Sequence, residues 1–120
     1  MNILLAEDDT NIATIARLAL EKLSGHDLTW VDNGQKAIEL LKSNSFDVVL
    51  LDEMMPEKNG LSAAQEIREV LQLKVPIIFL SAKSHSDDVD NFMKWGQGHI
   101  AKPFDPKNLS QLILDILQKT

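Results

Sequence analysis

The sequence predicts an α/β fold in which a five-stranded parallel sheet carries helices on both faces, an arrangement called doubly wound. Five short apolar runs alternate along the chain with segments whose apolar residues recur at helical spacing. Such alternation is typical of a parallel sheet with right-handed crossovers. The run 48–51 contains no polar residue, as expected for a strand buried on both faces. Helices on both faces require the strand order to reverse, and a crevice opens there at the carboxyl ends of the strands.

The length and composition predict one globular domain. A chain of 120 residues fits a single domain, residues 1–120, and can bury roughly two-thirds of the surface that its unfolded chain exposes. Because cysteine is absent, neither a disulfide framework nor a thiolate metal site can form. No apolar run reaches the roughly 18 residues that suggest a membrane span. We therefore expect a cytoplasmic protein that does not bind membranes.

The charge distribution argues against direct contact with nucleic acid. The net charge is −6, and the 12 basic residues are scattered along the chain. A protein that binds a phosphate backbone usually gathers its basic residues into a stripe or patch. We therefore expect the partners to be proteins.

The first predicted strand, residues 3–6, leads into a predicted helix over residues 11–23. Asp9 or Thr10 can cap this helix, and Ser24-Gly25 ends it. Its predicted inner face consists of Ile12, Ile15, Ala16, Ala19 and Leu23.

The middle of the chain supplies two more strands and two more helices. A strand over 28–31 and a turn at 32–34 precede a helix over 35–42, and the third strand ends at Asp52. Ser62 and Gln65 have the spacing of a capping box, which predicts a helix from there to about residue 71. The predicted inward residues of these two helices are Ala37, Ile38, Leu41, Ala63, Ile67 and Leu71.

The last third of the chain repeats this alternation. Pro76 introduces a fourth strand that ends at Ser81, and a helix is predicted from residues 86–88, where Ser and two Asp residues suit a helix start, to Trp95. A short strand over 99–101 follows. Asp105 as cap and Pro106 as the first helical residue predict the final helix. The inner face of that helix is predicted to be Leu109, Leu112, Ile113 and Ile116.

Polar side chains stand where these strands end. Glu7 and Asp8 follow the first strand, Asp52 the third, Ser81 the fourth and Lys102 the fifth. The carboxyl ends of parallel strands line one crevice, so these side chains are expected to converge there. Taken alone, Asp52 is equally well explained as a turn residue or a helix cap.

Three converging carboxylates predict a divalent cation. Two carboxylates about 5 Å apart repel by about 3 kcal/mol at an effective dielectric constant near 20, so a cation is needed to hold Glu7, Asp8 and Asp52 together. All-oxygen ligands suit Mg²⁺, and also Mn²⁺, better than zinc. The alternative is a buried cluster of ion pairs without a metal.

A cation beside Lys102 and the Ser81 hydroxyl makes a site for a phosphoryl group. Transfer of that group requires charge neutralisation and in-line placement of a nucleophile. Asp52 would be the nucleophile and would form an acyl phosphate.

These residues resemble the receiver domains of two-component response regulators, and the resemblance covers residues 3 to about 119. The motifs that carry it are Glu7-Asp8, Asp52 followed by Met55-Pro56 and Gly60, the hydroxyl of Ser81, and Lys102-Pro103-Phe104. The family's fold is flavodoxin-like, (βα)5 with strand order 2-1-3-4-5.

The resemblance implies a phosphorylation-activated signalling switch. Asp52 would accept a phosphoryl group from a sensor histidine kinase, from a phosphotransfer protein of a phosphorelay, or from a small phosphodonor. Asp8, Asp52 and the backbone carbonyl of Met54 would bind Mg²⁺ directly, and Glu7 through water. The Lys102-Pro103 bond is often cis in the family. The protein would not be an enzyme except in its own phosphorylation and dephosphorylation.

The resemblance also implies an output surface around helix four, strand five and helix five, which a downstream protein or effector domain would recognise. In the family's switch, the hydroxyl at Ser81 is coupled to an aromatic ring three residues before the lysine. Here that position holds His99. Either His99 rotates as the ring does and its charge makes signalling sensitive near neutral pH, or it is a surface histidine at a strand end.

Two other functions are compatible with parts of the sequence. A phosphatase of the haloacid dehalogenase type also uses an Asp at a strand end, but it needs a second acid where this chain has Met54. A receiver that acts as an adaptor independently of phosphate is another alternative. Met54 and Lys83 would flank the path of an attacking water. The remaining aromatic predictions are surface positions for His26 and His85 and packing roles for Trp30 and Trp95.

Overall fold

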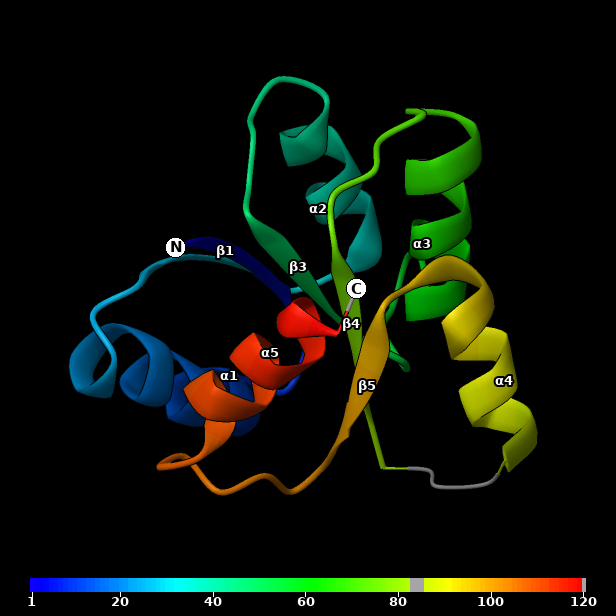
Figure 1. Ribbon diagram of the computed structural model, residues 1–120. Helices are drawn as coiled ribbons and strands as arrows, with labels where there is room; N and C mark the ends of the chain where they lie inside the picture. The colour runs from blue at the N-terminus through cyan, green and yellow to red at the C-terminus, as the bar shows by residue number, and fades with distance from the viewer. Residues whose placement is uncertain (83–85, 120) are drawn as a thin grey trace.

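The computed structural model describes residues 1–82 and 86–119, and its architecture is the predicted doubly wound α/β fold (Figure 1). The five strands form one parallel sheet in the order β2-β1-β3-β4-β5, which confirms the predicted order. The strands are β1 (Asn2–Ala6), β2 (Asp27–Val31), β3 (Val48–Asp52), β4 (Ile77–Ser81) and β5 (Gly98–Ala101). The helices are α1 (Thr10–Arg17), the π-helix η1 (Leu18–Leu23), α2 (Gly34–Leu41), α3 (Gly60–Glu69), α4 (Ser86–Trp95) and α5 (Leu109–Gln118).

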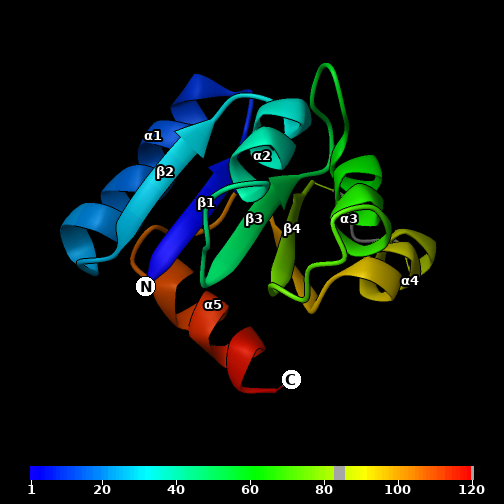
Figure 2. The same ribbon diagram turned by 90° about the horizontal axis from the view of Figure 1, so that it is seen from above.

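The sheet separates two hydrophobic cores. Helices α1 and α5, with η1, cover one face, and α2, α3 and α4 cover the other (Figures 1 and 2). Alternate residues of each strand point into opposite cores because side chains alternate along a strand. In β3, Val48 and Leu50 lie in the α1–α5 core, whereas Val49 and Leu51 lie in the other. The central strand is therefore buried throughout, as its uninterrupted apolar run predicts.

The first helix starts as predicted, and Ala16 and Ala19 of its predicted inner face are buried, but other residues of that face are not. Asp9 caps it by accepting hydrogen bonds from the backbone N–H groups of Asn11 and Ile12. The prediction that Ile15 and Leu23 lie on the inner face is wrong, since they are 41% and 60% exposed. The wider turns of η1 shift the angular position of Leu23, which a constant helical period does not anticipate, whereas Ile15 lies in α1, before η1 begins. The buried residues of this segment are Ala13, Ala16, Ala19 and Leu20.

Helix α3 begins earlier than the capping-box prediction. Asn59 is the cap, and its side chain accepts a hydrogen bond from the backbone N–H of Ser62 at 2.8 Å. Ser62 therefore lies in the first turn and does not cap the helix. Ala63 and Ile67 are buried, as predicted.

Helix α5 begins later than predicted. Residues 106–108 form a turn, and the Asp105 side chain accepts a hydrogen bond from the backbone N–H of Lys107 at 2.9 Å. Helical structure starts at Leu109, so Pro106 is not its first residue. Leu109 and Ile113 are buried as predicted, but Leu112 is exposed, so its placement on the inner face was wrong.

Within the described residues, no helix is both long and apolar enough to cross a membrane. The predictions for Lys83 and His85 lie outside the described residues.

Candidate functional site

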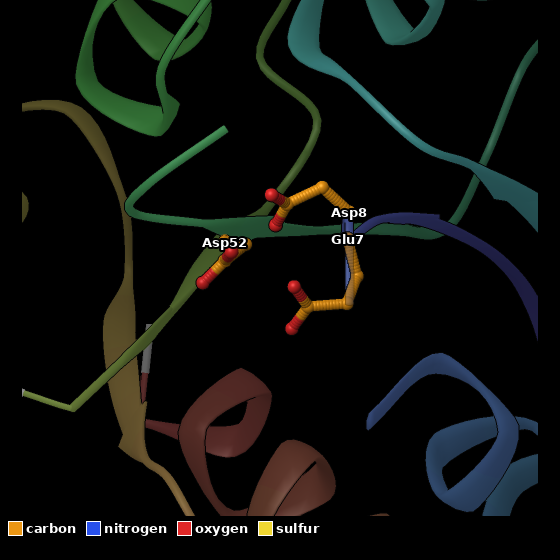
Figure 3. A group of neighbouring side chains, drawn as sticks. All are labelled: Glu7, Asp8 and Asp52. Atoms are coloured by element: carbon orange, nitrogen blue, oxygen red, sulfur yellow. The ribbon is translucent and has the colours of Figure 1, made fainter. Parts of the chain in front are cut away.

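The carboxyl ends of β1 and β3 bring three acids together. Ala6 of β1 pairs with Leu51 of β3, so the residues that follow each strand emerge side by side. Glu7, Asp8 and Asp52 each offer a carboxylate oxygen, and these oxygens lie within 4.8 Å of one another. Figure 3 shows the carboxyl groups of Glu7 and Asp8 extending from the end of β1 toward the side on which Asp52 lies. The structure therefore assembles the predicted acidic cluster.

Lys102 supplies a positive charge to this cluster from the end of β5. Its Nζ atom donates a hydrogen bond to Asp52 Oδ1 at 2.6 Å and lies 3.3 Å from Glu7 Oε1. The Lys102-Pro103 peptide bond is cis, as the family resemblance suggested. One ammonium group therefore faces two buried carboxyl groups, as sequence reasoning expected.

Burial sets the protonation behaviour of these groups. Desolvation, followed by the hydrogen bond and charge of Asp52, raises the pKa of Glu7 to about 8. Desolvation also raises the pKa of Asp52, although hydrogen bonds with Glu7 and Lys102 oppose the change. Burial alone would lower the pKa of Lys102, but its hydrogen bonds and attraction to Asp52 and Glu7 raise it overall. The single positive charge of Lys102 thus does not balance the negative charge that the acids of the cluster would carry when ionised.

The donor set fits a hard divalent cation. Glu7 is fully buried and Asp52 is only 3% exposed, whereas Asp8 is open to solvent. Buried carboxylates that face each other are stabilised by a cation, and the exposed side leaves room for water ligands. Oxygen ligands of this kind suit Mg²⁺ or Mn²⁺.

Two glycines let the β3–α3 loop close tightly behind Asp52. The Gly60 N–H donates to the Glu53 carbonyl at 3.1 Å, and a Cβ at Gly60 would collide with the backbone carbonyl of Asp52. A Cβ at Gly34 would likewise collide with the carbonyl of Lys58 in the same loop. Only glycine permits these two backbone approaches.

Ser81 lies at the end of β4 and is fully buried. Its Oγ donates a hydrogen bond to Glu53 Oε2 at 2.7 Å. Sequence reasoning assigned no role to Glu53. The signal that could have found it is its position, because the residue after Asp52 faces the residue after Leu80 when Asp52 pairs with Leu80.

A second residue that sequence reasoning missed is Trp30 of β2, which was assigned to packing alone. It does pack against the α1–α5 core, and its indole N–H also donates to the Glu7 backbone carbonyl at 2.8 Å. A partly buried Trp usually finds a hydrogen-bond acceptor. Trp30 therefore fixes the backbone from which the first acid of the cluster projects.

The other residues singled out from the sequence are His99, Trp95 and Met54. His99 of β5 is partly buried, and its ring centroid is 6.4 Å from that of Phe92 in α4. Trp95 packs against the core beneath α4, as predicted. The Met54 side chain is exposed, and the role predicted for its carbonyl stays a prediction.

His26 was predicted to be a surface residue, but it is partly buried and makes two contacts with residues distant in sequence. Its Nδ1 is 3.1 Å from the Met1 amino group, and its Nε2 is 3.0 Å from Ser110 Oγ. His26 therefore joins the start of β1 to helix α5. Its position before β2 brings it beside residues that are distant in sequence, which periodicity cannot reveal.

Comparison with known proteins gives consistent matches across nearly the whole chain. A family model described as the response regulator receiver domain matches residues 3–114. The transcriptional regulatory protein RprY of Bacteroides fragilis is 33% identical over 120 residues, which are 99% of this chain and 50% of RprY. SrrA of Staphylococcus aureus, also a transcriptional regulatory protein, is 34% identical over 119 residues, which are 98% of this chain and 48% of SrrA. The chain spans about half the length of these curated relatives.

Solved structures show the same fold. The receiver domain of Francisella response regulator 1452 matches with a TM-score of 0.86 and 27% identity, over 98% of this chain and 97% of that one. The receiver domain of the sensor histidine kinase PA1611 from Pseudomonas aeruginosa matches with a TM-score of 0.83 and 32% identity, again over 98% and 97% of the two chains. That structure holds a magnesium ion coordinated in its active site cleft.

Proposed function

This chain belongs to the response regulator receiver domain family, and from that premise we propose that Asp52 is its phosphoacceptor. The observation that carries the proposal is the position of the Asp52 carboxyl group. It ends a fully buried strand, shares a cluster with two other acids, and accepts a hydrogen bond from Lys102 at 2.6 Å. A nucleophile held this firmly, with one cationic neighbour, suits phosphoryl transfer.

Mg²⁺ is the proposed cofactor, and Mn²⁺ would fit the same donors. Asp8 and Asp52 would hold it directly together with the backbone carbonyl of Met54, and Glu7 would act through water. Support comes from the acidic cluster and from the magnesium ion in the related PA1611 receiver. When bound, the cation neutralises charge on the carboxylates and on the oxygens of the incoming phosphoryl group.

The chain's own residues have distinct roles in the proposed transfer. An Asp52 oxygen attacks the phosphorus of a phosphohistidine or of a small acyl phosphate. A P–O bond forms as the P–N or P–O bond to the donor breaks, and the leaving group keeps the electron pair. Lys102 would then pair with an oxygen of the new acyl phosphate, and the Ser81 hydroxyl would donate to another. The chain would catalyse only its own phosphorylation and dephosphorylation.

The proposed partners are a sensor histidine kinase or phosphotransfer protein upstream and a protein or effector domain downstream. The phosphoryl group would stabilise one of two arrangements of the surface formed by α4, β5 and α5. Support comes from the position of Ser81 and Lys102, which lie at the ends of neighbouring strands β4 and β5. His99 on β5, beside Phe92 of α4, is placed to respond if this surface moves.

Incubation with Mg²⁺ and acetyl phosphate, followed by intact-protein mass spectrometry, tests the proposal. We expect the mass of one phosphoryl group to be added, and chelation of the cation to prevent it. Asp52→Asn should abolish the addition, whereas the control Asp115→Asn, an acid on α5, should leave it unchanged. Equal labelling of Asp52→Asn would show that another group is the acceptor.

The same reagents distinguish the alternatives. A phosphatase would turn over phosphomonoesters repeatedly, whereas the proposed switch would not hydrolyse them and would carry at most one phosphoryl group at a time. An adaptor that does not depend on phosphate would bind its partner equally well as the Asp52→Asn variant.

A further inference from the structure

Glu53 holds the Ser81 hydroxyl in a position that does not serve the phosphoacceptor. The Ser81 Oγ–H donates to Glu53 Oε2 at 2.7 Å, and Ser81 is fully buried. A hydroxyl has a single hydrogen to donate. While that hydrogen is shared with Glu53, it is not available to an oxygen on Asp52.

The pairing of β3 with β4 explains this arrangement. Asp52 pairs with Leu80, and the Glu53 N–H continues the ladder by donating to the Leu80 carbonyl at 2.9 Å. Side chains alternate along each strand, so Glu53 and Ser81 fall on the side of the sheet occupied by Leu51 and Phe79. That is the side covered by α2, α3 and α4.

Asp52 falls on the opposite side of the pleat. Its strand neighbour Leu50 and its pairing partner Leu80 both belong to the α1–α5 core. A hydroxyl bound to Glu53 is therefore held on the α4 side of the sheet. To reach a group carried by Asp52, it has to leave Glu53.

We propose that Glu53 is a positioning residue that sets the resting state of the switch by competing with the phosphoryl group for the Ser81 hydroxyl. This inference rests on the proposed function of Asp52. Hydrogen bonds to a charged acceptor are stronger than neutral ones, so breaking this one opposes activation. Glu53 would thus determine how much of the protein adopts the activated arrangement at a given level of phosphorylation.

The inference is tested by the affinity for beryllium trifluoride, a noncovalent phosphoryl mimic, titrated calorimetrically at a fixed Mg²⁺ concentration. We expect Glu53→Ala to bind the mimic about tenfold more tightly than the parent chain, which corresponds to about 1.4 kcal/mol. Glu53→Gln keeps an acceptor oxygen and should give an intermediate gain. Thermal unfolding of each variant verifies that it is folded.

The decisive control repeats the Glu53 substitutions in a Ser81→Ala background. Removing the charge of Glu53 strengthens the binding of any anion, and that effect persists without the hydroxyl. The double-mutant cycle isolates the effect that depends on Ser81. We expect Glu53→Ala to change the affinity less than twofold in Ser81→Ala, and the tenfold gain to return in Ser81→Thr.

Each outcome separates this inference from the proposed function. Equal gains in the parent and Ser81→Ala backgrounds would show that Glu53 acts through charge alone and would overturn the inference. No gain in either background would do the same. If the parent chain is not phosphorylated at Asp52 in the mass assay, the proposed function itself fails.

Discussion

Gly60 places the β3–α3 loop against the backbone of Asp52, where a Cβ would collide with the Asp52 carbonyl. We expect Gly60→Ala to lower the free energy of unfolding by about 2 kcal/mol, because the loop must move to relieve the overlap. The same movement should displace Asp52 and slow its phosphorylation. Urea denaturation and the rate of labelling by acetyl phosphate measure the two effects.

Gly25 offers a matched control for that substitution. Its φ of +72° disfavours a side chain, but no atom lies within 4 Å of the Cβ that alanine would add. Gly25→Ala should cost about 1 kcal/mol of stability through backbone strain alone. Its phosphorylation rate should match that of the parent chain. A similar slowing in both variants would mean that lost stability, not displacement of Asp52, causes the effect.

His26 predicts how stability depends on pH. Burial, followed by the positive charge of the Met1 amino group, lowers the pKa of His26, although Asp27 opposes the change. The unfolded chain therefore binds a proton more readily than the folded one. The stabilising contribution is complete above the pKa of unfolded histidine, about 6.5, and is lost as the pH falls through the lower folded value. The urea concentration at the midpoint of unfolding should therefore decrease as the pH is lowered below 6.5.

His26→Gln is the comparison for that measurement. Glutamine keeps hydrogen-bonding groups but does not titrate, so the decline of stability below pH 6.5 should be shallower in the variant. Parallel curves for the two proteins would show that other groups cause the decline.

At the scale of single residues, the sequence predicted the polar residues that stand at the ends of buried strands. Asp52 was identified because a fully apolar run stops there, and Lys102 because it follows the last strand. The roles of Glu53 and Trp30 were not predicted, because they depend on strand register and on a contact between neighbouring strands. Neither the register nor the contact between strands can be recognised from the local spacing of apolar residues.

The start of helix α3 distinguishes two candidate caps. Asn59 accepts the hydrogen bond from the Ser62 N–H, so Asn59→Ala should reduce the free energy of unfolding by about 1 kcal/mol. Ser62→Ala should cost less than about 0.5 kcal/mol because a serine in the first turn is not the cap. Chemical denaturation of both variants compares the two costs. A larger loss for Ser62→Ala would restore the capping-box prediction.

Arg68 ties helix α3 to the segments around it. It donates to the backbone carbonyls of Trp95 at 3.0 Å and Leu73 at 2.9 Å, and to the Gln97 side chain at 3.3 Å. Arg68→Met should destabilise the protein by about 2 kcal/mol, because partly buried acceptors lose their donor. Thermal and urea unfolding measure the loss.

The matched control for Arg68 is Arg17, which forms an exposed pair with Glu21 one helical turn away. Arg17→Met should change stability by less than about 0.5 kcal/mol. A comparable loss in both variants would mean that the Arg68 contacts contribute no more than a surface ion pair.

At the scale of elements, sequence predicted that each helix exists and approximately where it lies. Leu23 was wrongly placed on the inner face of the first helix because the π-helix η1 breaks the regular period. The start of α5 shifted because Asp105 forms a turn instead of a cap. Both errors come from local hydrogen bonding that competes with the regular helical pattern.

Binding of the proposed cation should be measurable as stability of the whole molecule. A ligand at 100 times its dissociation constant stabilises the folded state by about 2.7 kcal/mol. Excess Mg²⁺ should therefore raise the midpoint of thermal unfolding of the parent chain. Asp8→Asn should lose this increase, whereas Asp115→Asn should keep it. An equal increase in Asp8→Asn would place the cation elsewhere.

At the scale of the whole molecule, simple rules predicted a doubly wound parallel sheet, and the family resemblance supplied its strand order. Alternation of apolar strands with amphipathic helices led to a parallel sheet, and right-handed crossovers restricted its connections. Side chains far apart in the sequence, such as Glu7 and Lys102, were thereby expected to meet, as they do. The rules could not foresee which hydrogen bond Ser81 makes, because that depends on side-chain geometry after the sheet has formed.

The path of the chain also has a practical use. Each helix returns the backbone to the edge at which strands begin, so Met1 and the end of α5 lie at that edge, away from the acidic cluster (Figure 2). A fluorescent protein or an affinity tag fused to either end would emerge far from Asp52. Surface immobilisation through such a tag would leave the cluster open to a kinase in flow, which makes this chain convenient for biosensor measurements.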